Sequence, residues 1–341
     1  MIPSIEWINN KVKMIDQTVL PHKLEFLEFD NYRDVATSIK LMNIRGAPAI
    51  GVAAAMGMAL ATLEYKDLPK KAFIKEMEKA ADIIRNTRPT ASNLFWAINR
   101  IWDIINTYPD SPSNLSELVV EEAKLMAQED INVNKNIGKN GATLLDDGDV
   151  VLTHCNAGSL ATVQYGTALA PVRAAIEQGK NISVIADETR PRLQGARLTA
   201  YELQFDKIPV NVISDTSSGL IMRLGKINKV IVGTDRVTSD AVFNKIGTYL
   251  VALAAKDNNI PFYVAAPTST LSLHEIIKDV TIEQRDSSEV SKVLGQVQIV
   301  PEGVECINYA FDITPFRLVS AIITEDGVYS PKELLKKYKK S

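Results

Sequence analysis

The sequence has few of the residues that identify several common classes of protein. Its 341 residues include two cysteines, Cys155 and Cys306, which are too few for a disulfide framework or a zinc site. We therefore expect the reducing environment of the cytoplasm. The formal net charge is only -3, so no basic excess favours nucleic acid or an anionic membrane as a partner. The first ten residues lack the basic and apolar segments of a signal peptide, and none is expected.

The sequence also lacks the short motifs of many nucleotide and metal enzymes. No Gly-x-Gly occurs, which argues against NAD, and no Gly-x-x-x-x-Gly-Lys-Ser/Thr occurs, which argues against ATP. His-Glu-x-x-His is missing, and the three histidines (His22, His154 and His274) are scattered along the chain. These absences predict neither a nucleotide cofactor nor a bound metal.

No apolar run is long enough to predict a transmembrane helix. The longest run, residues 47–63, is shorter than the roughly 20 residues that a membrane span needs. Because the run is rich in alanine and glycine, it predicts a buried helix that packs closely against its neighbours.

The distribution of apolar residues predicts two domains of different construction. Residues 1–30 alternate as strands do, which predicts a small antiparallel sheet, and residues 31–108 show helical spacing. A long helix is expected over residues 115–145. After Asp146, five β-branched runs appear, and predicted helices lie between most of them, as in residues 163–179 and 244–259. This pattern is typical of a Rossmann-like, doubly wound parallel sheet. We therefore predict an α/β protein with an N-terminal β/helical domain (1–130) and a Rossmann-like catalytic domain (131–341).

Polar residues end each of the five β-branched runs, and ligands of such sheets bind beyond the carboxyl ends of the strands. These ends are residues 153–155, 187–189, 214–215, 233–235 and 267–268. Cys155 is either a small buried hydrophobe or a reactive thiol, because a neighbouring helix N-terminus can lower the pKa of a thiol. Asp235 is either a loop cap or a general acid–base group whose pKa burial would raise.

Two segments predict sites for a phosphate group. Residues 156–166 and 214–225 are expected to place glycine and serine at the start of a helix, where backbone N–H groups and the helix dipole favour an anion. Guanidinium groups also suit phosphate, and the candidates are Arg45, Arg88, Arg190, Arg192 and Arg197. The alternative for each arginine is an ion pair at the surface.

Seven segments, taken together, resemble the methylthioribose-1-phosphate isomerase family. They are "IRGAPAIGVAAAMGMAL", "TRPTASNLFWAINRI", "LTHCNAGSLAT", "DETRPRLQGARLTAYEL", "VGTDRV", "NKIGTY" and "NYAFDITPFRLVSAIITEDGV", in the order in which they occur. The resemblance extends from about residue 4 to residue 329. The wider group includes ribose-1,5-bisphosphate isomerase and the regulatory subunits of an exchange factor for translation initiation.

The resemblance implies an aldose–ketose isomerase of methionine salvage that acts as a homodimer without a cofactor. The expected reaction converts 5-methylthioribose 1-phosphate into 5-methylthioribulose 1-phosphate, so the partner is a small sugar phosphate. It implies that Cys155 and Asp235 are the catalytic pair. The implied substrate contacts are Arg45, Gly46, Ala47, Arg88, Gln194, Asn244 and Lys245.

One departure from the family pattern leaves the group at C5 of the sugar open. Residues 235–245, "DRVTSDAVFNK", replace the usual Asn-Gly-Asp stretch and are one residue shorter. A 5-deoxyribose 1-phosphate is therefore an alternative or additional substrate. The wider group supplies two further alternatives, ribose 1,5-bisphosphate as the substrate and a regulatory subunit without catalysis. The choice between a hydride shift and an enediol path is equally open.

Overall fold

The computed structural model describes residues 1–89, 91–108 and 112–338. The chain divides into two compact units: residues 1–132 with 159–166, and residues 133–158 with 167–341. The segment 159–166 therefore belongs to the first unit, although it follows a strand of the second. The domains predicted from the sequence, residues 1–130 and 131–341, stay a prediction.

The first unit begins with the predicted small antiparallel sheet, which is confirmed. Its strands are β1 (Ile5–Ile8), β2 (Lys11–Ile15) and β3 (Phe26–Phe29), and β2 lies in the middle. Asn9 and Asn10 join β1 to β2 with φ values of 51° and 58°. Asparagine tolerates this left-handed conformation, which gives a two-residue turn the twist of the strands.

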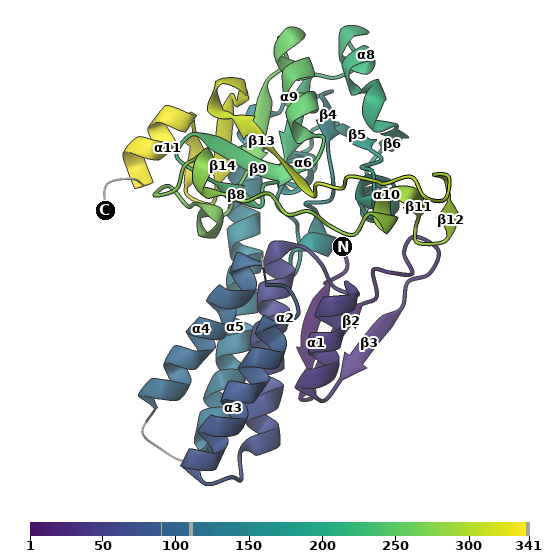
Figure 1. The fold of residues 1–341 in the computed structure, drawn as a ribbon. Coiled ribbons are helices and arrows are strands. Elements are labelled where there is room, and N and C mark those ends of the chain that lie inside the picture. Colours follow the sequence, from purple (N-terminus) through teal and green to yellow (C-terminus); the bar gives the residue numbers. More distant parts are fainter. Residues whose placement is uncertain (90, 109–111, 339–341) are drawn as a thin grey trace. The chain divides into compact units, whose positions relative to one another are not determined.

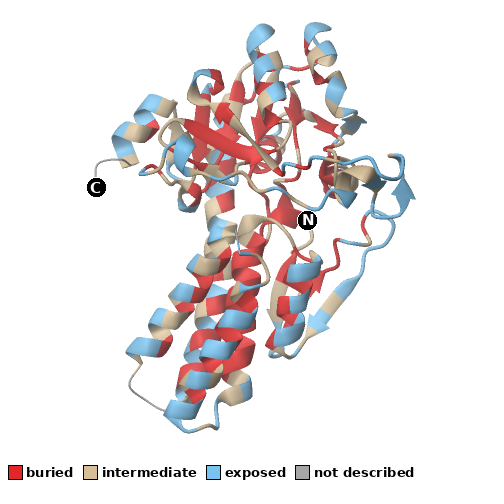
Figure 2. Cartoon of the chain, in the orientation of Figure 1, coloured by how far each residue is buried: buried red, intermediate tan, exposed pale blue. Residues whose placement is uncertain are grey.

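The helices of the first unit surround one central apolar helix. This helix, α2 (Ala47–Tyr65), packs against α1 (Tyr32–Leu41), α3 (Lys70–Arg85) and α4 (Ser92–Thr107) (Figure 1). It is long and apolar enough to cross a membrane, but 78% of its most apolar window is buried inside the protein. Figure 2 colours buried residues red, and much of the first unit's helical core has this colour. The predicted close-packed core helix is confirmed. A fifth helix, α5 (Pro112–Gly141), runs from the first unit into the second.

The second unit contains the predicted parallel sheet, with all five expected strands. Its order is β15-β14-β10-β7-β4-β5-β6, and only the β14–β15 pair is antiparallel. The strands are β4 (Val150–Thr153), β5 (Ser183–Asp187), β6 (Val210–Ile213), β7 (Lys229–Val232), β10 (Phe262–Ala265), β14 (Ala321–Thr324) and β15 (Gly327–Tyr329). The last two strands were not predicted.

The strand order places a topological switch point between β4 and β7. From β4 the chain adds β5 and β6 on one side, and then returns to the other side of β4 to form β7. The two strands pair in parallel, with Leu152 opposite Val230. In open α/β sheets the ligand crevice lies at the carboxyl ends of the strands that flank such a point.

Helices and two smaller sheets complete the second unit. A three-stranded antiparallel sheet has the order β13-β9-β8, and β11 pairs with β12. The three-stranded sheet consists of β8 (Arg236–Val237), β9 (Ala241–Lys245) and β13 (Phe311–Pro315). The two-stranded sheet consists of β11 (Lys292–Val293) and β12 (Val297–Gln298). The helices are α6 (Ala170–Glu177), α7 (Ala200–Phe205), α8 (Ser218–Arg223), α9 (Thr248–Asp257), α10 (Ser288–Ser291) and α11 (Pro331–Tyr338).

Three helical predictions were wrong in part. No α-helix follows β4 directly: one 3-10 turn, η2 (Ser159–Ala161), forms, and α6 begins only at Ala170. Tyr165 and Gly166 have φ values of 78° and 84°, which a right-handed helix excludes. The long helix predicted to reach residue 145 ends at Gly141. Asn244 and Lys245, predicted to begin a helix, lie instead in β9, because β8 and β13 pair with that strand on both sides.

Candidate active site

Cys155 is the second residue after β4, and its backbone is held on both sides. Its φ is 66°, a left-handed conformation that a side chain of this size adopts only when its surroundings hold it. The hydroxyl of Thr189 accepts the Cys155 N–H at 2.8 Å, and the hydroxyl of Thr199 donates to the Cys155 carbonyl at 2.7 Å. Both threonines follow β5 in the chain, so the segment after β5 positions the half-buried Cys155.

A buried polar network supports Thr199 from behind. The side-chain amide of Asn156 donates to the Thr199 hydroxyl at 3.1 Å and to Oε1 of Glu202 at 2.6 Å. The other oxygen of Glu202 accepts a hydrogen bond from Arg173 at 2.7 Å. Because these side chains are all buried, each relies on the others for its hydrogen bonds. The network therefore stabilises the backbone conformation at Cys155.

Asp235 lies in the turn between β7 and β8. Its N–H donates to the Phe243 carbonyl at 2.9 Å, and the Thr234 hydroxyl donates to the same carbonyl at 2.9 Å. The side chain of Asp235 is exposed. Neighbouring strand residues therefore do not bury this carboxyl group.

The structure brings the chain segments of Cys155 and Asp235 into contact. Cys155 follows β4 and Asp235 follows β7, the two strands that flank the switch point. A β-carbon on Gly233 would lie 2.5 Å from the β-carbon of Ala157, so the two strand ends touch there. Gly233 is two residues before Asp235, and Ala157 is two residues after Cys155. The predicted catalytic residues therefore extend from adjoining strand ends.

Asn244 and Lys245 lie on β9, the strand that pairs with β8 just after Asp235. Both are buried, and Asn244 donates to the hydroxyl of Thr248 at 3.0 Å. The ammonium of Lys245 donates to the Ala310 carbonyl at 2.7 Å and lies 4.6 Å from the centre of the Phe311 ring. The structure thus groups this predicted pair with Asp235.

Gln194 is buried in the segment between β5 and α7, to which Thr189 also belongs. Its side-chain oxygen has no hydrogen-bond partner among the described residues. An unsatisfied buried acceptor costs about 1–3 kcal/mol. A ligand hydroxyl that donates to this oxygen would remove that cost, which is consistent with the predicted substrate contact.

The four other predicted contacts belong to the first unit, whereas the five residues above belong to the second. Arg45, Gly46 and Ala47 lie at the N-terminus of α2, and Arg88 lies between α3 and α4. Gly46 has a φ of 95°, and a β-carbon there would lie 2.3 Å from the Ala161 carbonyl oxygen. Only glycine therefore fits at this helix start.

Two arginines that were candidates for phosphate contact protein groups instead. Arg192 forms an ion pair with Glu289 at 2.8 Å, and Arg190 donates to the Val290 carbonyl at 2.9 Å. Both partners are in α10. For Arg192 the ion-pair alternative is the one that the structure supports.

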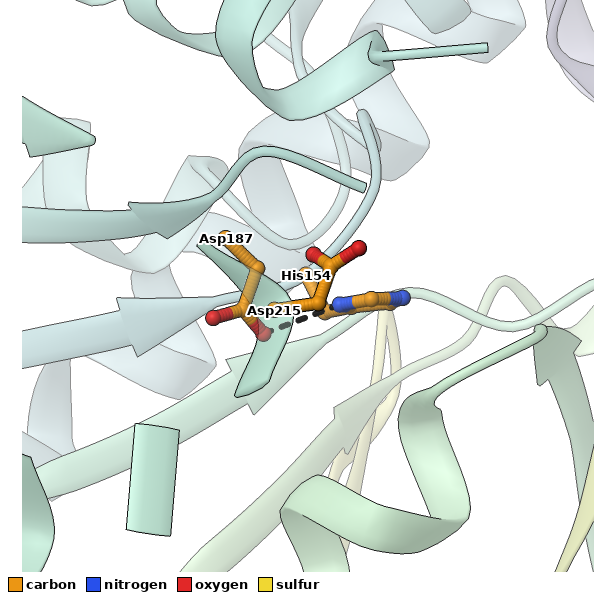
Figure 3. Close-up of side chains that lie close together, drawn as sticks. All are labelled: His154, Asp187 and Asp215. Atoms are coloured by element: carbon orange, nitrogen blue, oxygen red, sulfur yellow. Dashed lines mark hydrogen bonds and ion pairs between the residues drawn. The ribbon is translucent and has the colours of Figure 1, made fainter. Parts of the chain in front are cut away.

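A buried pair at the same strand ends, formed by His154 and Asp187, was not predicted from the sequence. Nδ1 of His154 lies 2.9 Å from Oδ2 of Asp187, a contact drawn as a dashed line in Figure 3. Nε2 of His154 lies 2.8 Å from the Ile246 carbonyl oxygen. Burial opposes the charge on His154, but the hydrogen bond and charge of Asp187, with help from Ile246 and Asp215, outweigh it, so the pKa of His154 is raised. The polar residues at the strand ends could have indicated this pair, whereas the scattered positions of the three histidines along the chain could not.

Asp215 lies beside this pair, so three potential metal ligands come within 4.8 Å of one another. Both oxygens of Asp215 already accept backbone N–H groups, from Thr189 and Arg190, each at 2.7 Å. Both nitrogens of His154 face protein acceptors. A metal needs an unprotonated imidazole nitrogen, so the three side chains fit a hydrogen-bonded network better than a metal site.

Comparison with known proteins agrees with this architecture. The model of the Initiation factor 2 subunit family matches residues 43–331. Methylthioribose-1-phosphate isomerase of Thermosipho africanus is 54% identical over 338 residues, which cover 98% of this chain and 97% of the relative. This chain belongs to the methylthioribose-1-phosphate isomerase group of that family.

Two solved structures share the whole fold with this member of the family. The 5-methylthioribose 1-phosphate isomerase of Pyrococcus horikoshii OT3 is 40% identical with a TM-score of 0.95, covering 100% of this chain and 97% of that chain. A chain from A. fulgidus, described as translation initiation factor eIF-2B, subunit delta, is 48% identical with a TM-score of 0.91. That match covers 99% of this chain and 100% of the other. The predicted fold class is confirmed.

Proposed function

We propose that this protein converts the aldose 5-methylthioribose 1-phosphate into the ketose 5-methylthioribulose 1-phosphate in methionine salvage. Its full-length similarity to isomerases with this name supports the reaction. The observation that carries the chemistry is the switch point, where a thiol and a carboxyl group, Cys155 and Asp235, extend from the adjoining ends of β4 and β7. Ligands of doubly wound sheets bind at this position.

The substrate needs an acid, because its phosphate blocks ordinary opening of the sugar ring. In the proposed mechanism Asp235 protonates the ring oxygen, the bond from that oxygen to C1 breaks, and positive charge develops at C1. The exposed carboxyl of Asp235 is accessible to the sugar, and the bound sugar would exclude water from it. Cys155 lies beside C1 and C2, and Asp235 accepts the proton of the C2 hydroxyl as the C2 carbonyl forms.

Two paths can move the hydrogen from C2 to C1, and each conserves atoms and electrons. In a hydride shift, the C2 hydrogen moves with its electron pair to C1. In an enediol path, Cys155 removes the C2 hydrogen as a proton, the electron pair forms a C1–C2 double bond, and a proton returns to C1. Reaction in deuterated water separates them, because only the enediol path allows solvent deuterium at C1.

Cys155→Ser and Asp235→Asn test the catalytic pair. Each change should lower kcat about 100-fold or more, the usual contribution of a general acid or base, while the sugar phosphate still binds. Cys306→Ser, in a loop, and Asp257→Asn, at the exposed last residue of α9, are matched controls and should keep wild-type kcat. Ketose formation measures turnover, and calorimetry measures binding. Near-normal turnover of either test variant would remove that residue from the mechanism.

A panel of three sugar phosphates tests the substrate. The methylthio substrate should have the highest kcat/KM, 5-deoxyribose 1-phosphate should follow, and ribose 1,5-bisphosphate should react poorly because its second phosphate needs cationic partners. Preference for the bisphosphate would refute the substrate assignment. Failure of the wild-type protein to form ketose from all three would favour the regulatory alternative instead.

We also propose a homodimer whose contact includes four exposed leucines on α8 and its neighbour α9. Leu220 and Leu250 are 60% and 68% exposed, and Leu224 and Leu253 lie on the same two helices or directly after them. Exposed apolar clusters of this kind commonly mark protein contacts. Leu220→Glu with Leu250→Glu should produce monomers in sedimentation experiments, and an unchanged dimer would exclude this surface.

We propose a cytoplasmic enzyme with a small-molecule partner and no nucleic-acid or membrane partner, which the net charge of -3 supports. The isomerisation moves electrons only within the sugar, so it needs no cofactor. Dialysis against a chelator should leave turnover unchanged, and loss of activity that a divalent metal restores would refute this part.

A further inference from the structure

We propose that His154, as a buried imidazolium, is a positioning residue that holds the Cys155 segment against the turn after Lys245. Its two ring N–H groups donate to Asp187 and to the Ile246 carbonyl, and so join three strand ends. The inference rests on the proposed role of Cys155 in turnover. In addition, it requires that the neighbouring His154 ring is positively charged when Cys155 acts.

The hydrogen bonds themselves indicate two protons on the ring. A carbonyl oxygen only accepts, so Nε2 of His154, 2.8 Å from the Ile246 oxygen, carries a proton. Nδ1 lies 2.9 Å from Oδ2 of Asp187, whose other oxygen accepts the hydroxyl of Ser218 at 2.6 Å. The contact between Nδ1 and Oδ2 needs a second proton, which we place on Nδ1, so the ring is a cation.

The charges around the ring favour the cation. Asp187 faces it from β5, Asp215 from the turn after β6, and Asp312 from β13. Lys245 on β9 is a cation that interacts electrostatically with Asp312. Burial lowers the pKa of His154, but Asp187, the Ile246 carbonyl and Asp215 together have the larger effect, so the pKa is raised.

The ring connects the parts that the proposed reaction needs. His154 is the residue before Cys155, and Ile246 is the residue after Lys245. Gly247 lies directly against the ring: its φ is 104°, and a β-carbon there would lie 2.8 Å from Cε1 of His154. A neutral ring would lose one charge-assisted hydrogen bond, and the Cys155 segment would then be less firmly held against β9.

Asp187→Asn removes the charge and keeps the shape. The new amide can donate to an unprotonated Nδ1 and still accept the Ser218 hydroxyl, so a neutral ring stays hydrogen-bonded. We expect kcat to fall about 5- to 10-fold, the range for a charge-assisted hydrogen bond replaced by a neutral one, with KM changed less than about threefold. His274→Gln, at an exposed histidine, is the control and should keep wild-type kcat and KM.

Nitrogen-15 NMR of labelled histidine measures the charge without substrate. The chain has three histidines, and His154→Gln identifies the His154 signals by their loss. In the wild type both ring nitrogens should carry protons at pH 7, whereas in Asp187→Asn one nitrogen should lose its proton at a lower pH than in the wild type.

The outcomes separate the two proposals. A singly protonated His154 in the wild type at pH 7, or a folded Asp187→Asn variant with unchanged kcat, would overturn the positioning role. Wild-type protein without isomerase turnover would refute the proposed function, whatever the NMR result. Should Asp187→Asn fail to fold, the wild-type NMR measurement still decides the charge of the ring.

Discussion

Replacement of Arg173 by methionine tests the buried network behind Cys155. Arg173 is 3% exposed, and its guanidinium lies 2.7 Å from both Glu202 and Asp206. Methionine keeps most of the apolar volume but leaves two carboxylates side by side without a cation. Breaking a buried ion pair from one side costs about 3–5 kcal/mol, because the remaining charge stays buried and uncompensated.

The expected loss is large enough to measure as a melting temperature. The second unit has about 200 residues, and for a unit of this size 1 kcal/mol corresponds to about 2–4 °C. Arg173→Met should therefore melt about 6–20 °C below the wild type in far-UV circular dichroism at a fixed scan rate. Because Glu202 also holds Asn156, next to Cys155, ketose formation should fall as well.

Arg223→Met is the matched control. Arg223 pairs with Asp257 at 3.0 Å, but both side chains are about 70% exposed. Exposed pairs contribute about 0–1 kcal/mol, so the control should melt within about 4 °C of the wild type. Equal shifts in the two variants, or a shift below about 4 °C in Arg173→Met, would refute the claim that this network stabilises the site.

Two further predictions concern backbone approach and pH. Gly195→Ala would place a β-carbon 1.7 Å from the Asp187 carbonyl oxygen, so it should give insoluble or poorly folded protein. In the control Gly219→Ala on α8, the new β-carbon would lie 3.7 Å from the Ala254 side chain. The control should be neutral or stabilise the protein by up to about 1 kcal/mol, and melting temperatures measure both effects. The raised pKa of His154 contributes stability that is complete below its unfolded pKa of about 6.5 and is lost as pH rises through the folded pKa. Urea unfolding from pH 6 to 9.5 should show this decline in the wild type and not in His154→Gln, and identical pH profiles would contradict it.

Local chemistry explains why much of the fold could be predicted. The Asn9–Asn10 turn, the Ala-rich helix α2 and the five β-branched strands each depend on residues close together in the chain. Their spacing sets which face is buried, whatever surrounds them. The polar strand ends followed from the same patterns, and with them the positions of Cys155 and Asp235.

Longer-range pairing explains what was missed. Asn244 and Lys245 resemble the start of a helix, but β8 and β13 pair with them as strand. Residues 163–169 have a helical composition, yet the N–H groups of Thr167 and Ala168 bind the Ala157 carbonyl. In both cases hydrogen bonds to distant partners outweigh a weak local preference.

The amino-acid sequence by itself determined the order of the elements, the two kinds of construction and the residues that end each strand, because these depend on neighbours within a few positions. Only the tertiary structure decided which strand ends meet. Thr153 pairs with Ala186 across β4 and β5, so His154 lies beside Asp187, 33 positions away. Strand order and register come from packing across the whole sheet, and they place a buried charge beside Cys155.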